Sequence, residues 1–318
     1  MLKKGANRER VLTVLEHTGL DSPEQVADAA RETGVPAADV YGAGSFYTLL
    51  SHTQAGTRVC QGLSCKMAGS DQLLADLRAK GERCQPVSCL GQCDRAPAAI
   101  DLELEVQSKV PRGAVTAASA DLPMNLAGTD TADYAALAKA AAMGAAAVLD
   151  VIDASGLQGR GGAGFPAGRK WRMVAGQAVT ERYVVCNADE AEPGTFKDRE
   201  CMLRRPHRLL EGLAIAAFAV GASDIYIYIR GEFTEERRRI QRALAEAPPW
   251  PVELNWHVVL GHGAYICGEE TALLESLEGR RGMPRLKPPY PVESGFRGKP
   301  TLMNNVETLL CVPEIVLR

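Results

Sequence analysis

The pattern of hydrophobic and polar positions divides the chain into a helical beginning and an alternating second half. Helical spacing runs through RVLTVLEHTG, SPEQVADAARETG and PAADVYGAGSFYTLL, and Ser22 is placed to cap the second of these helices. Beyond residue 180, strands are predicted at RYVVCNA, DIYIYIR and VELNWHVVLG, and helices at RLLEGLAIAAFAVG, TEERRRIQRALAEA and EETALLESLEG. This alternation favours a layered α/β domain with a mostly parallel sheet.

The middle of the chain suggests where the domains meet. SDQLLADLRAKG predicts a helix, and PAAIDLELEV predicts one short strand. Residues 111–135 are rich in Pro, Gly, Ser, Thr and Ala, which is typical of a linker. YAALAKAAAMGAAAVLDVIDASG then predicts a single helix that stops at Gly156. We therefore expect one domain over 1–110 and a second over 136–318.

Composition and charge bear on the protein's partners and cellular location. The net charge of −3 gives no reason to expect a nucleic-acid partner or an anionic membrane. The N-terminus does not resemble a secretory signal, and the most apolar segment, Gly212 to Ser223, is shorter than the roughly 20 residues of a membrane helix. We expect a cytoplasmic protein without direct membrane insertion, in which the nine cysteines do not form a disulfide framework.

Five of the cysteines fall in one short stretch, which is the first sign of metal chemistry. Four of them form two pairs, Cys60-x4-Cys65 and Cys89-x3-Cys93, separated by 23 residues. Thiolates suit iron–sulfur clusters or zinc, and a [2Fe–2S] cluster takes two thiolates per iron. The cluster is the preferred interpretation, with a zinc site or unliganded buried cysteines as alternatives. The fifth, Cys84, is expected to be a spare buried thiol.

A glycine-rich loop, GRGGAGFPAG, occupies residues 159–168. Gly159, Gly161 and Gly164 satisfy the G-x-G-x-x-G pattern of a dinucleotide site, and Asp189 follows at a suitable distance. That motif must directly follow a strand, however, whereas the preceding AAAVLDVIDAS has the character of a helix. We therefore expect a different nucleotide site, in which glycines admit a flat or anionic ligand and Arg160 and Lys170 provide charge for phosphate. A merely flexible loop is the alternative.

Two acidic segments add candidate binding groups. Asn187 to Gly194 follows a predicted strand; if extended, Asn187 and Asp189 face one way and Glu190 and Glu192 the other. Amides and carboxylates at a strand's carboxyl end suit a ribose or polyol, although a solvated acidic turn would have the same composition. Later in the chain, a strand is expected to end at Cys267, before a turn at Gly268 and a helix beginning with two acids.

The cysteine segment resembles a known family of electron-transfer domains. VYGAGSFYTLL, VCQGLSCKMAG and PVSCLGQCDRAPAAI are similar to the thioredoxin-like [2Fe–2S] subunit of respiratory complex I and its soluble relatives. The gap between the cysteine pairs is shorter than in the complex I subunit and looks more like the fused N-terminal domain of NAD-linked formate dehydrogenases. The resemblance implies that Cys60, Cys65, Cys89 and Cys93 bind a [2Fe–2S] cluster.

The second half resembles the flavin- and NADH-binding subunit of complex I, a module that also serves NAD-linked hydrogenases and formate dehydrogenases. The blocks are GRGGAGFPAGRKW, CNADEAEPGTFKDR, YICGEETALLESLEG, RGMPRLKPPYP and GKPTLMNNVETL. The resemblance implies a Rossmann-like α/β domain in which FMN is surrounded by Arg160, Gly161, Gly162, Gly164, Lys170, Asn187, Asp189, Glu190, Gly268, Glu269, Asn304, Asn305 and Thr308. It implies further that Phe165 stacks on NADH and that the nucleotide pocket includes Glu192, Glu270, Lys287 and Tyr290.

These resemblances imply an NADH:acceptor oxidoreductase that exchanges hydride between NAD(H) and FMN and passes electrons to iron–sulfur clusters. The expected partners are other subunits of a redox complex. The chain would be the beta subunit of an NAD-dependent formate dehydrogenase, with a hydrogenase or complex I diaphorase subunit as the alternative. Two other classes stay open: an ordinary Rossmann dehydrogenase, and a ferredoxin-like adaptor without catalysis. Because only Cys311 follows Cys267, we also expect the family's four-cysteine [4Fe–4S] segment to be missing.

Overall fold

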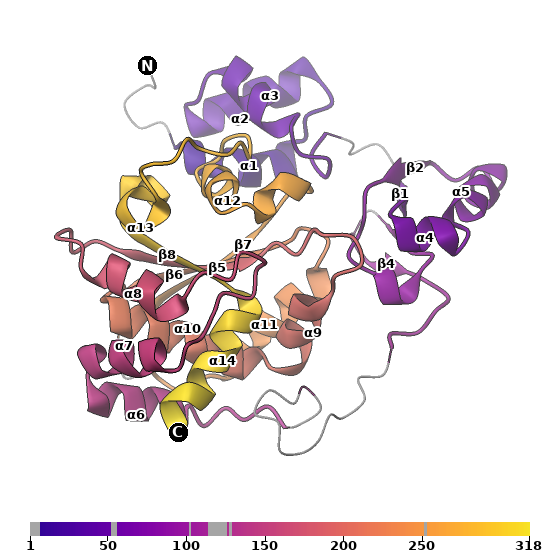
Figure 1. Cartoon of the computed structure of the whole chain (residues 1–318). Coiled ribbons are helices and arrows are strands. Elements are labelled where there is room, and N and C mark those ends of the chain that lie inside the picture. Colours follow the sequence, from indigo (N-terminus) through magenta and orange to yellow (C-terminus); the bar gives the residue numbers. More distant parts are fainter. Residues whose placement is uncertain (1–6, 52–55, 102, 114–125, 127–128, 251–252) are drawn as a thin grey trace.

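The computed structural model describes residues 7–51, 56–101, 103–113, 126, 129–250 and 253–318, and these form three parts (Figure 1). We name them the N-terminal helices (7–51), the cysteine domain (56–113) and the sheet domain (129–318). The cysteine domain lies at one side of the sheet domain, and the N-terminal helices lie above its sheet in the view shown. The expected α/β class, with helices and a cysteine-bearing domain preceding a parallel-sheet domain, is confirmed.

The N-terminal helices follow the sequence prediction closely. They are η1 Arg8–Arg10, α1 Val11–Thr18, α2 Pro23–Thr33 and α3 Ala37–Gly44. The Ser22 hydroxyl accepts a hydrogen bond from the Gln25 backbone at 3.3 Å, and the Gln25 side chain accepts one from the Ser22 backbone at 3.0 Å. This reciprocal pair satisfies two amide groups that a helix start leaves without partners.

The cysteine domain is a small sheet with helices beside it. Its elements are β1 Thr57–Cys60, α4 Leu63–Met67, α5 Ser70–Ala79, β2 Cys84–Val87, η2 Cys93–Arg95, β3 Ala99–Ile100 and β4 Val106–Gln107. The strand order is β2-β1-β3-β4, in which only the β1–β2 pair is parallel. The single strand predicted at PAAIDLELEV is wrong: the segment folds back into the β3–β4 hairpin, because the Asp101 carboxylate accepts the Glu105 amide at 2.8 Å and closes a turn.

The sheet domain has a four-stranded parallel sheet in the order β7-β6-β5-β8. Its strands are β5 Tyr183–Ala188, β6 Asp224–Ile229, β7 Asn255–Leu260 and β8 Thr301–Asn305. Its helices are α6 Ala135–Met143, α7 Ala145–Ala154, α8 Ala167–Ala175, α9 Lys197–Arg204, α10 Pro206–Val220, α11 Thr234–Glu246, η3 Tyr265–Gly268, α12 Glu270–Leu277, α13 Pro291–Ser294, η4 Phe296–Gly298 and α14 Val306–Leu317. The three strands and three helices predicted beyond residue 180 are all present.

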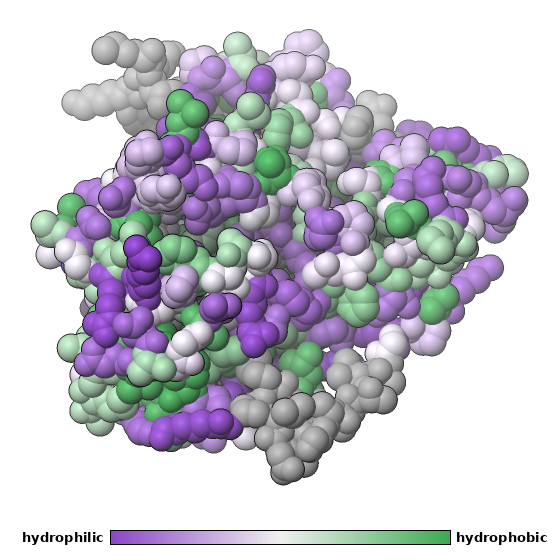
Figure 2. Space-filling view, viewed as in Figure 1, coloured by the Kyte–Doolittle hydropathy of each residue, from purple (hydrophilic) through white to green (hydrophobic). Residues whose placement is uncertain are grey.

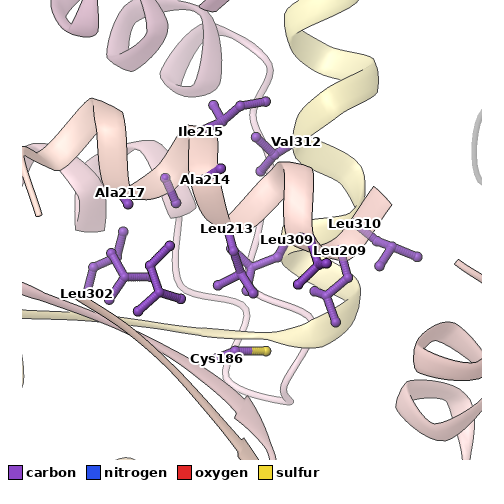
Figure 3. Packing of buried hydrophobic residues seen from close by; sticks show 14 of the residues in the cluster. Cys186, Leu209, Leu213, Ala214, Ile215, Ala217, Leu302, Leu309, Leu310 and Val312 are labelled. Carbon is purple, nitrogen blue, oxygen red and sulfur yellow. The ribbon is translucent and has the colours of Figure 1, made fainter. Parts of the chain in front are cut away.

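Both faces of this sheet are buried, in two different cores. Along β6, Ile225, Ile227 and Ile229 join one hydrophobic cluster, whereas Tyr226 and Tyr228 join the other. The first cluster includes leucines of α10 and α14, which meet Leu302 and Cys186 of the sheet (Figure 3). Alternate side chains of a strand point to opposite faces, so an unbroken apolar run is what a sheet covered on both sides requires.

The second core includes side chains of the N-terminal helices, which the sequence did not predict. Residues of α1 to α3, including Leu12 and Leu15, cluster with Val185 and Tyr226 of the sheet and with Leu273 of α12. The N-terminal helices therefore cover one face of the sheet domain, although they stand next to the cysteine segment in the sequence. Most of the expected linker, residues 114–125 and 127–128, lies outside the described residues, so the domain boundaries around it stay a prediction.

Two further predictions about elements are wrong. The helix expected from Tyr134 to Gly156 is divided into α6 and α7, because Gly144 adopts φ 84°, a conformation that a glycine reaches without a side-chain clash. The segment ending at Cys267 is the 3₁₀ helix η3 rather than a strand. Within the described residues, no single helix combines the length and apolar character needed to cross a bilayer. Among these residues, α6 and α7 together have that length and apolar character, but they are bent by 112° relative to each other.

Candidate functional site

The candidate site lies where the parallel strands of the sheet domain end. β5 leads into Asp189 and the acidic turn, β8 ends at Asn305, and the glycine loop between α7 and α8 lies beside Asn305. Ligands of open α/β sheets bind in the crevice outside the carboxyl ends of the strands. In Figure 2, the face that carries this region is mostly hydrophilic, with smaller hydrophobic groups between the polar ones.

Two adjoining cavities open here, of about 490 and 580 Å³. They share Gly161, Asn187, Gly268, Glu269 and Asn305, so they form one continuous depression. The larger is further lined by Gly164, Phe165, Lys170, Glu270, Lys287, Tyr290, Asn304 and Thr308. The smaller is further lined by Arg160, Gly162, Asp189, Glu190 and Glu192. The structure thus brings together every cofactor-binding residue that the sequence predicted, while their roles in binding stay predictions.

The glycine loop is held against the start of α14. The backbone amide of Arg160 donates to the buried Thr308 hydroxyl at 2.9 Å, and the Arg160 guanidinium pairs with Glu307 at 2.8 Å. A Cβ at Gly161 would lie 3.2 Å from the Asn305 Cβ, and Gly162 adopts φ 116°. The loop follows α7, a helix, as the sequence predicted, so the strand–loop–helix context of an ordinary Rossmann site is absent here.

Asp189 offers a buried acceptor that no group of the described residues uses. Its Oδ2 is buried and has no hydrogen-bond partner among the described residues, and Asp189 is one of the residues that line the smaller cavity. Burial raises the pKa of Asp189 to about 7, with the Arg230 charge acting in the opposite direction. A buried carboxylate oxygen without a partner is costly, and a hydroxyl group of a bound polyol would satisfy it. This orphaned atom fits the ribityl chain of a flavin nucleotide.

Glu190, which lines the smaller cavity, also has a structural role. Its carboxylate oxygens accept the backbone amides of Asp198 and Arg199 at 3.0 and 3.1 Å, so the side chain caps α9. Burial, and then the adjacent Asp198 carboxylate, raise the pKa of Glu190. Asn187 and Asp189 do lie on the cavity side together, where Asn187 Nδ2 donates to the Gly268 carbonyl at 2.9 Å.

The larger cavity combines paired charges with exposed rings. Lys287 bridges Glu269 and Glu270 at 2.9 and 3.1 Å, and the Glu269 carboxylate also caps α12 through the amides of Thr271 and Ala272. Burial lowers the pKa of Lys170, whose ammonium donates to the Met303 carbonyl at 3.2 Å. Phe165 and Tyr290 leave 38% and 51% of their surface exposed, which suits them to stack on a planar ligand.

Sequence reasoning missed a polar network in the wall of the smaller cavity. Lys197 contacts Asp198 at 2.6 Å, Glu307 at 3.2 Å and the Asn305 side-chain oxygen at 3.2 Å, and Asn305 Nδ2 donates to Asp198 at 2.5 Å. These contacts fix the orientation of the Asn305 amide. The letters KDR come shortly after a proline–glycine turn at residues 193–194, and that cue could have suggested a helix start with charges facing the site.

The four paired cysteines converge in the cysteine domain. Cys60, Cys65 and Cys89 are buried, and the sulfur atoms of Cys89 and Cys93 lie 3.6 Å apart. The pKa of the Cys60 thiol is raised. Hydrogen bonding with Cys65 is the largest cause, and hydrogen bonding with Cys89 acts to lower it. Backbone amides of Gly62 and Gly91 point at the sulfurs of Cys60 and Cys89, both at 3.4 Å. Amide donors around buried sulfurs suit an iron–sulfur cluster, whose potential such hydrogen bonds tune.

A zinc site and unliganded buried thiols were the two alternatives for this cysteine set. In the part of the chain that the structure describes, no group of three or more His, Cys, Asp or Glu side chains is arranged to hold a single metal ion. Structural zinc requires four ligands around one ion, whereas a [2Fe–2S] cluster divides them between two irons. Cys84 is half-buried rather than buried, and its sulfur approaches the Leu74 carbonyl at 3.8 Å, outside this set.

The cysteine loop is joined directly to the cavity loop. The backbone amide of Gly194, at the end of the acidic turn, donates to the Cys93 sulfur at 3.2 Å. The buried Arg199 donates to the Gly91 carbonyl at 2.8 Å and pairs with Asp94 at 2.8 Å. The same short turn therefore lines the smaller cavity with Glu190 and Glu192 and touches one of the four cysteines with Gly194.

Comparisons with known proteins agree with this two-part site. Residues 152–314, about half of the chain, match the family described as the Nuo51 FMN-binding domain, and residues 9–117 match the thioredoxin-like [2Fe-2S] ferredoxin. The chain is 52% identical over 181 residues to the F 2 subunit of the NADH-quinone oxidoreductase of Rhizobium meliloti, covering 54% of this chain and 43% of that protein. It is 52% identical over 193 residues to the corresponding F subunit of Aquifex aeolicus, covering 58% and 45%.

A solved structure resembles the whole arrangement. A chain of an NAD+-reducing [NiFe]-hydrogenase in the H2-reduced state superposes with a TM-score of 0.88 and 31% identity, covering 99% of this chain and 62% of that one. The present chain matches less than half the length of the two quinone oxidoreductase relatives. FMN and a [2Fe–2S] cluster are the cofactors that the two family descriptions name, and the orphaned Asp189 oxygen and the four converging cysteines fit them. The chain belongs to the Nuo51 FMN-binding domain family, with a thioredoxin-like [2Fe–2S] ferredoxin domain fused in front.

Proposed function

We propose that this chain is an NADH dehydrogenase, or diaphorase, module that exchanges hydride between NAD(H) and FMN and passes electrons to a [2Fe–2S] cluster. The observation that carries the proposal is the contact between the Gly194 amide and the Cys93 sulfur at 3.2 Å. Through it, the turn that lines the nucleotide-type cavity also touches a cluster ligand. The relatives from NADH-quinone oxidoreductases, which match this chain over 181 and 193 residues, support the choice of NADH.

The protein's own contribution is placement and electrostatics. The smaller cavity offers a polyol its hydrogen-bond partners, Asn187 and Asp189, beside a glycine loop that lets a flat group approach. The larger cavity offers Phe165 and Tyr290 as stacking rings, with Lys170 and Lys287 as cations for phosphate. FMN, when bound, accepts a hydride from NADH and can release electrons singly. No protein acid or base is required for that exchange.

A dye-reduction assay tests this proposal. The chain is purified anaerobically and loaded with FMN and iron–sulfide, and the rate of ferricyanide reduction is measured with NADH. A rate that depends on both NADH and FMN is expected. NADH oxidation without added or bound flavin would point to an ordinary dehydrogenase, and an intact cluster without any NADH oxidation would point to the non-catalytic adaptor.

The proposal also concerns the complex to which the chain belongs. We propose the beta subunit of an NAD-dependent formate dehydrogenase, on the basis of the fused ferredoxin domain and the short gap between the cysteine pairs. The hydrogenase alternative is favoured by a specific observation, because one hydrogenase chain matches 99% of this chain in a single superposition. Nine cysteines without a disulfide among them suit the reducing cytoplasm, where we place the protein.

Reconstitution with candidate catalytic subunits separates these partners. The holoprotein is mixed with a formate-oxidising or a hydrogen-oxidising subunit, and NAD+ reduction is followed with formate or H2 as the electron donor. Formate-dependent NAD+ reduction is expected. Reduction that occurs only with H2 would assign the chain to a hydrogenase instead.

A further inference from the structure

Arg230 occupies an unusual place between the two halves of the site. It follows the end of β6 directly and is only 5% exposed. Its guanidinium lies between the loop that carries Cys89 and the turn that carries Glu190, so a charged group is buried at the boundary between the cysteine domain and the sheet domain. Burying a charge is expensive unless it is paired and hydrogen-bonded, so its surroundings are informative.

All three nitrogen atoms of the guanidinium are used. Nη2 donates to the Cys89 carbonyl, and Nη1 donates to the Glu190 carbonyl at 2.8 Å. Nε donates to Glu232 Oε2 at 2.9 Å, and Nη2 also reaches Oε1 of the same carboxylate at 3.2 Å. The Glu232 side chain is itself buried, so this ion pair is shielded from water. A planar fork of donors suits such a fixed, multiple arrangement, whereas a lysine ammonium would not reproduce it.

The two carbonyls that Arg230 joins belong to different cofactor sites. Cys89 is one of the four cysteines of the cluster, and Glu190 stands in the turn that lines the smaller cavity. The same turn is held again four residues later, where the Gly194 amide meets the Cys93 sulfur at 3.2 Å. The turn is thereby joined to both members of the second cysteine pair. At Glu190 the link to Cys89 runs through the Arg230 side chain, and at Gly194 the backbone contacts the Cys93 sulfur directly.

We propose that Arg230 is a positioning residue that couples the cluster to the flavin cavity and raises the reduction potential of the cluster. The inference rests on the proposed function for the identity of the two cofactors. Reduction adds one negative charge to the cluster. A buried cation at a ligand's backbone stabilises the reduced form, and a buried anion at the same place opposes it. Arg230 and Glu232 therefore act on the potential with opposite signs.

The test is a mediated redox titration of the cluster in the full-length holoprotein, followed by electron paramagnetic resonance. Arg230→Gln is expected to lower the cluster potential by about 59 mV or more, a tenfold or larger change in the one-electron equilibrium constant. Glu232→Gln is expected to raise it. Arg238→Gln is the matched control: it removes an arginine that pairs with Glu105 across the same domain boundary, but on the exposed surface, and should leave the potential within that limit.

A second readout separates charge from geometry. Arg230→Lys retains the charge but cannot bind both carbonyls as the fork does, so its cluster potential should lie closer to the wild-type value than that of Arg230→Gln, while FMN is lost from both variants more readily. If Arg230→Gln and Glu232→Gln shift the potential in the same direction, or if neither shifts it, the inference is wrong. If Arg230→Gln does not fold, the sign of the Glu232→Gln shift decides alone.

The titration uses chemical mediators, so it needs neither NADH nor FMN turnover. A protein that shows the opposite shifts but no NADH oxidation would contradict the proposed function and support Arg230 as described. A protein that oxidises NADH but shows no shift would contradict the role of Arg230 and leave the proposed function standing.

Discussion

Asp189 and Glu190 are adjacent carboxylates with different surroundings. One buried oxygen of Asp189 has no partner among the described residues, whereas Glu190 uses both oxygens on backbone amides of α9. The sequence indicated two ligand-facing acids at the end of a strand. It could not show that Glu190 caps a helix, because the start of α9 at Lys197 depends on a turn of the chain that brings it back beside Glu190.

Asp189→Asn tests the raised pKa of that side chain. In the FMN-free protein the folded-state pKa of about 7 exceeds the ordinary value of 3.8, so the folded state holds the proton more tightly and loses stability as pH rises from about 4 to 7. The amide cannot ionise. We expect the variant to show a flatter stability profile over that range, with a higher urea midpoint than wild type at pH 8. FMN affinity should also fall, because the amide is a weaker hydrogen-bond acceptor for a ligand hydroxyl than the carboxylate is.

A parallel fall of stability with pH in wild type and Asp189→Asn would contradict this account. Glu82→Asn serves as the control, since Glu82 is an exposed carboxylate on the cysteine domain and lines neither cavity. Its profile should match that of wild type.

Glu270→Gln tests the larger cavity. Glu270 lines that cavity and pairs with Lys287 at 3.1 Å, but it does not line the smaller one. We expect the variant to bind NADH about tenfold more weakly, which corresponds to about 1.4 kcal/mol, and to retain FMN as wild type does. Equilibrium titration with NADH and the flavin content of the purified protein measure the two effects. Unchanged NADH affinity would remove Glu270 from the pocket.

At the scale of elements, the strands of the sheet domain were the most predictable features. RYVVCNA and DIYIYIR are short apolar runs bounded by turns, and both became buried parallel strands. The predicted helix from Tyr134 to Gly156 failed for a local reason. Ala-rich composition has high helix propensity on both sides of Gly144, and only the packing of α6 and α7 around α10 and α14 reveals the sharp bend.

Gly212→Ala tests the helix crossing that supports the sheet. A Cβ at Gly212 of α10 would lie 2.1 Å from the Leu309 carbonyl oxygen of α14, where the two helices pack closely (Figure 3). Because backbone atoms cannot yield as a side-chain end can, we expect the variant to lose about 1–3 kcal/mol or more of unfolding free energy. Chemical denaturation measures the loss. Gly113→Ala, where the added Cβ meets nothing within 4 Å, should be nearly neutral. Equal midpoints for the two variants would contradict the close crossing.

At the scale of the whole molecule, the N-terminal helices form part of the sheet domain's second core. Their amphipathic pattern and the Ser22 cap were visible in the sequence, but the surface that they cover was not. Long-range packing of this kind leaves no periodic signal, because each partner only shows an apolar face. The same limit applies to Arg230 and Lys197, which single motifs did not mark and which became notable only through contacts between distant segments.

Gly279→Ala tests this docking. Gly279 ends the helical region of α12 at φ 70°, and its Cβ would lie 1.9 Å from the Arg8 carbonyl oxygen. We expect faster hydrogen exchange in α1 to α3, with β5 and β6 staying protected. Gly81→Ala is matched to it, since Gly81 has φ 80° but no atom within 4 Å of the added Cβ, and it should leave α1 to α3 protected. Equal exchange of α1 to α3 in the two variants would contradict the docking of these helices at Gly279.

The central claim is that one chain carries an NADH-reducible flavin beside an iron–sulfur cluster. Its most direct test is the visible spectrum of the anaerobically purified chain, reconstituted with FMN, iron and sulfide, during a titration with NADH. We predict flavin bands over a broad iron–sulfur absorbance, with bleaching as NADH is added. A colourless protein, or one whose flavin and cluster absorbance do not respond to NADH, would contradict the account.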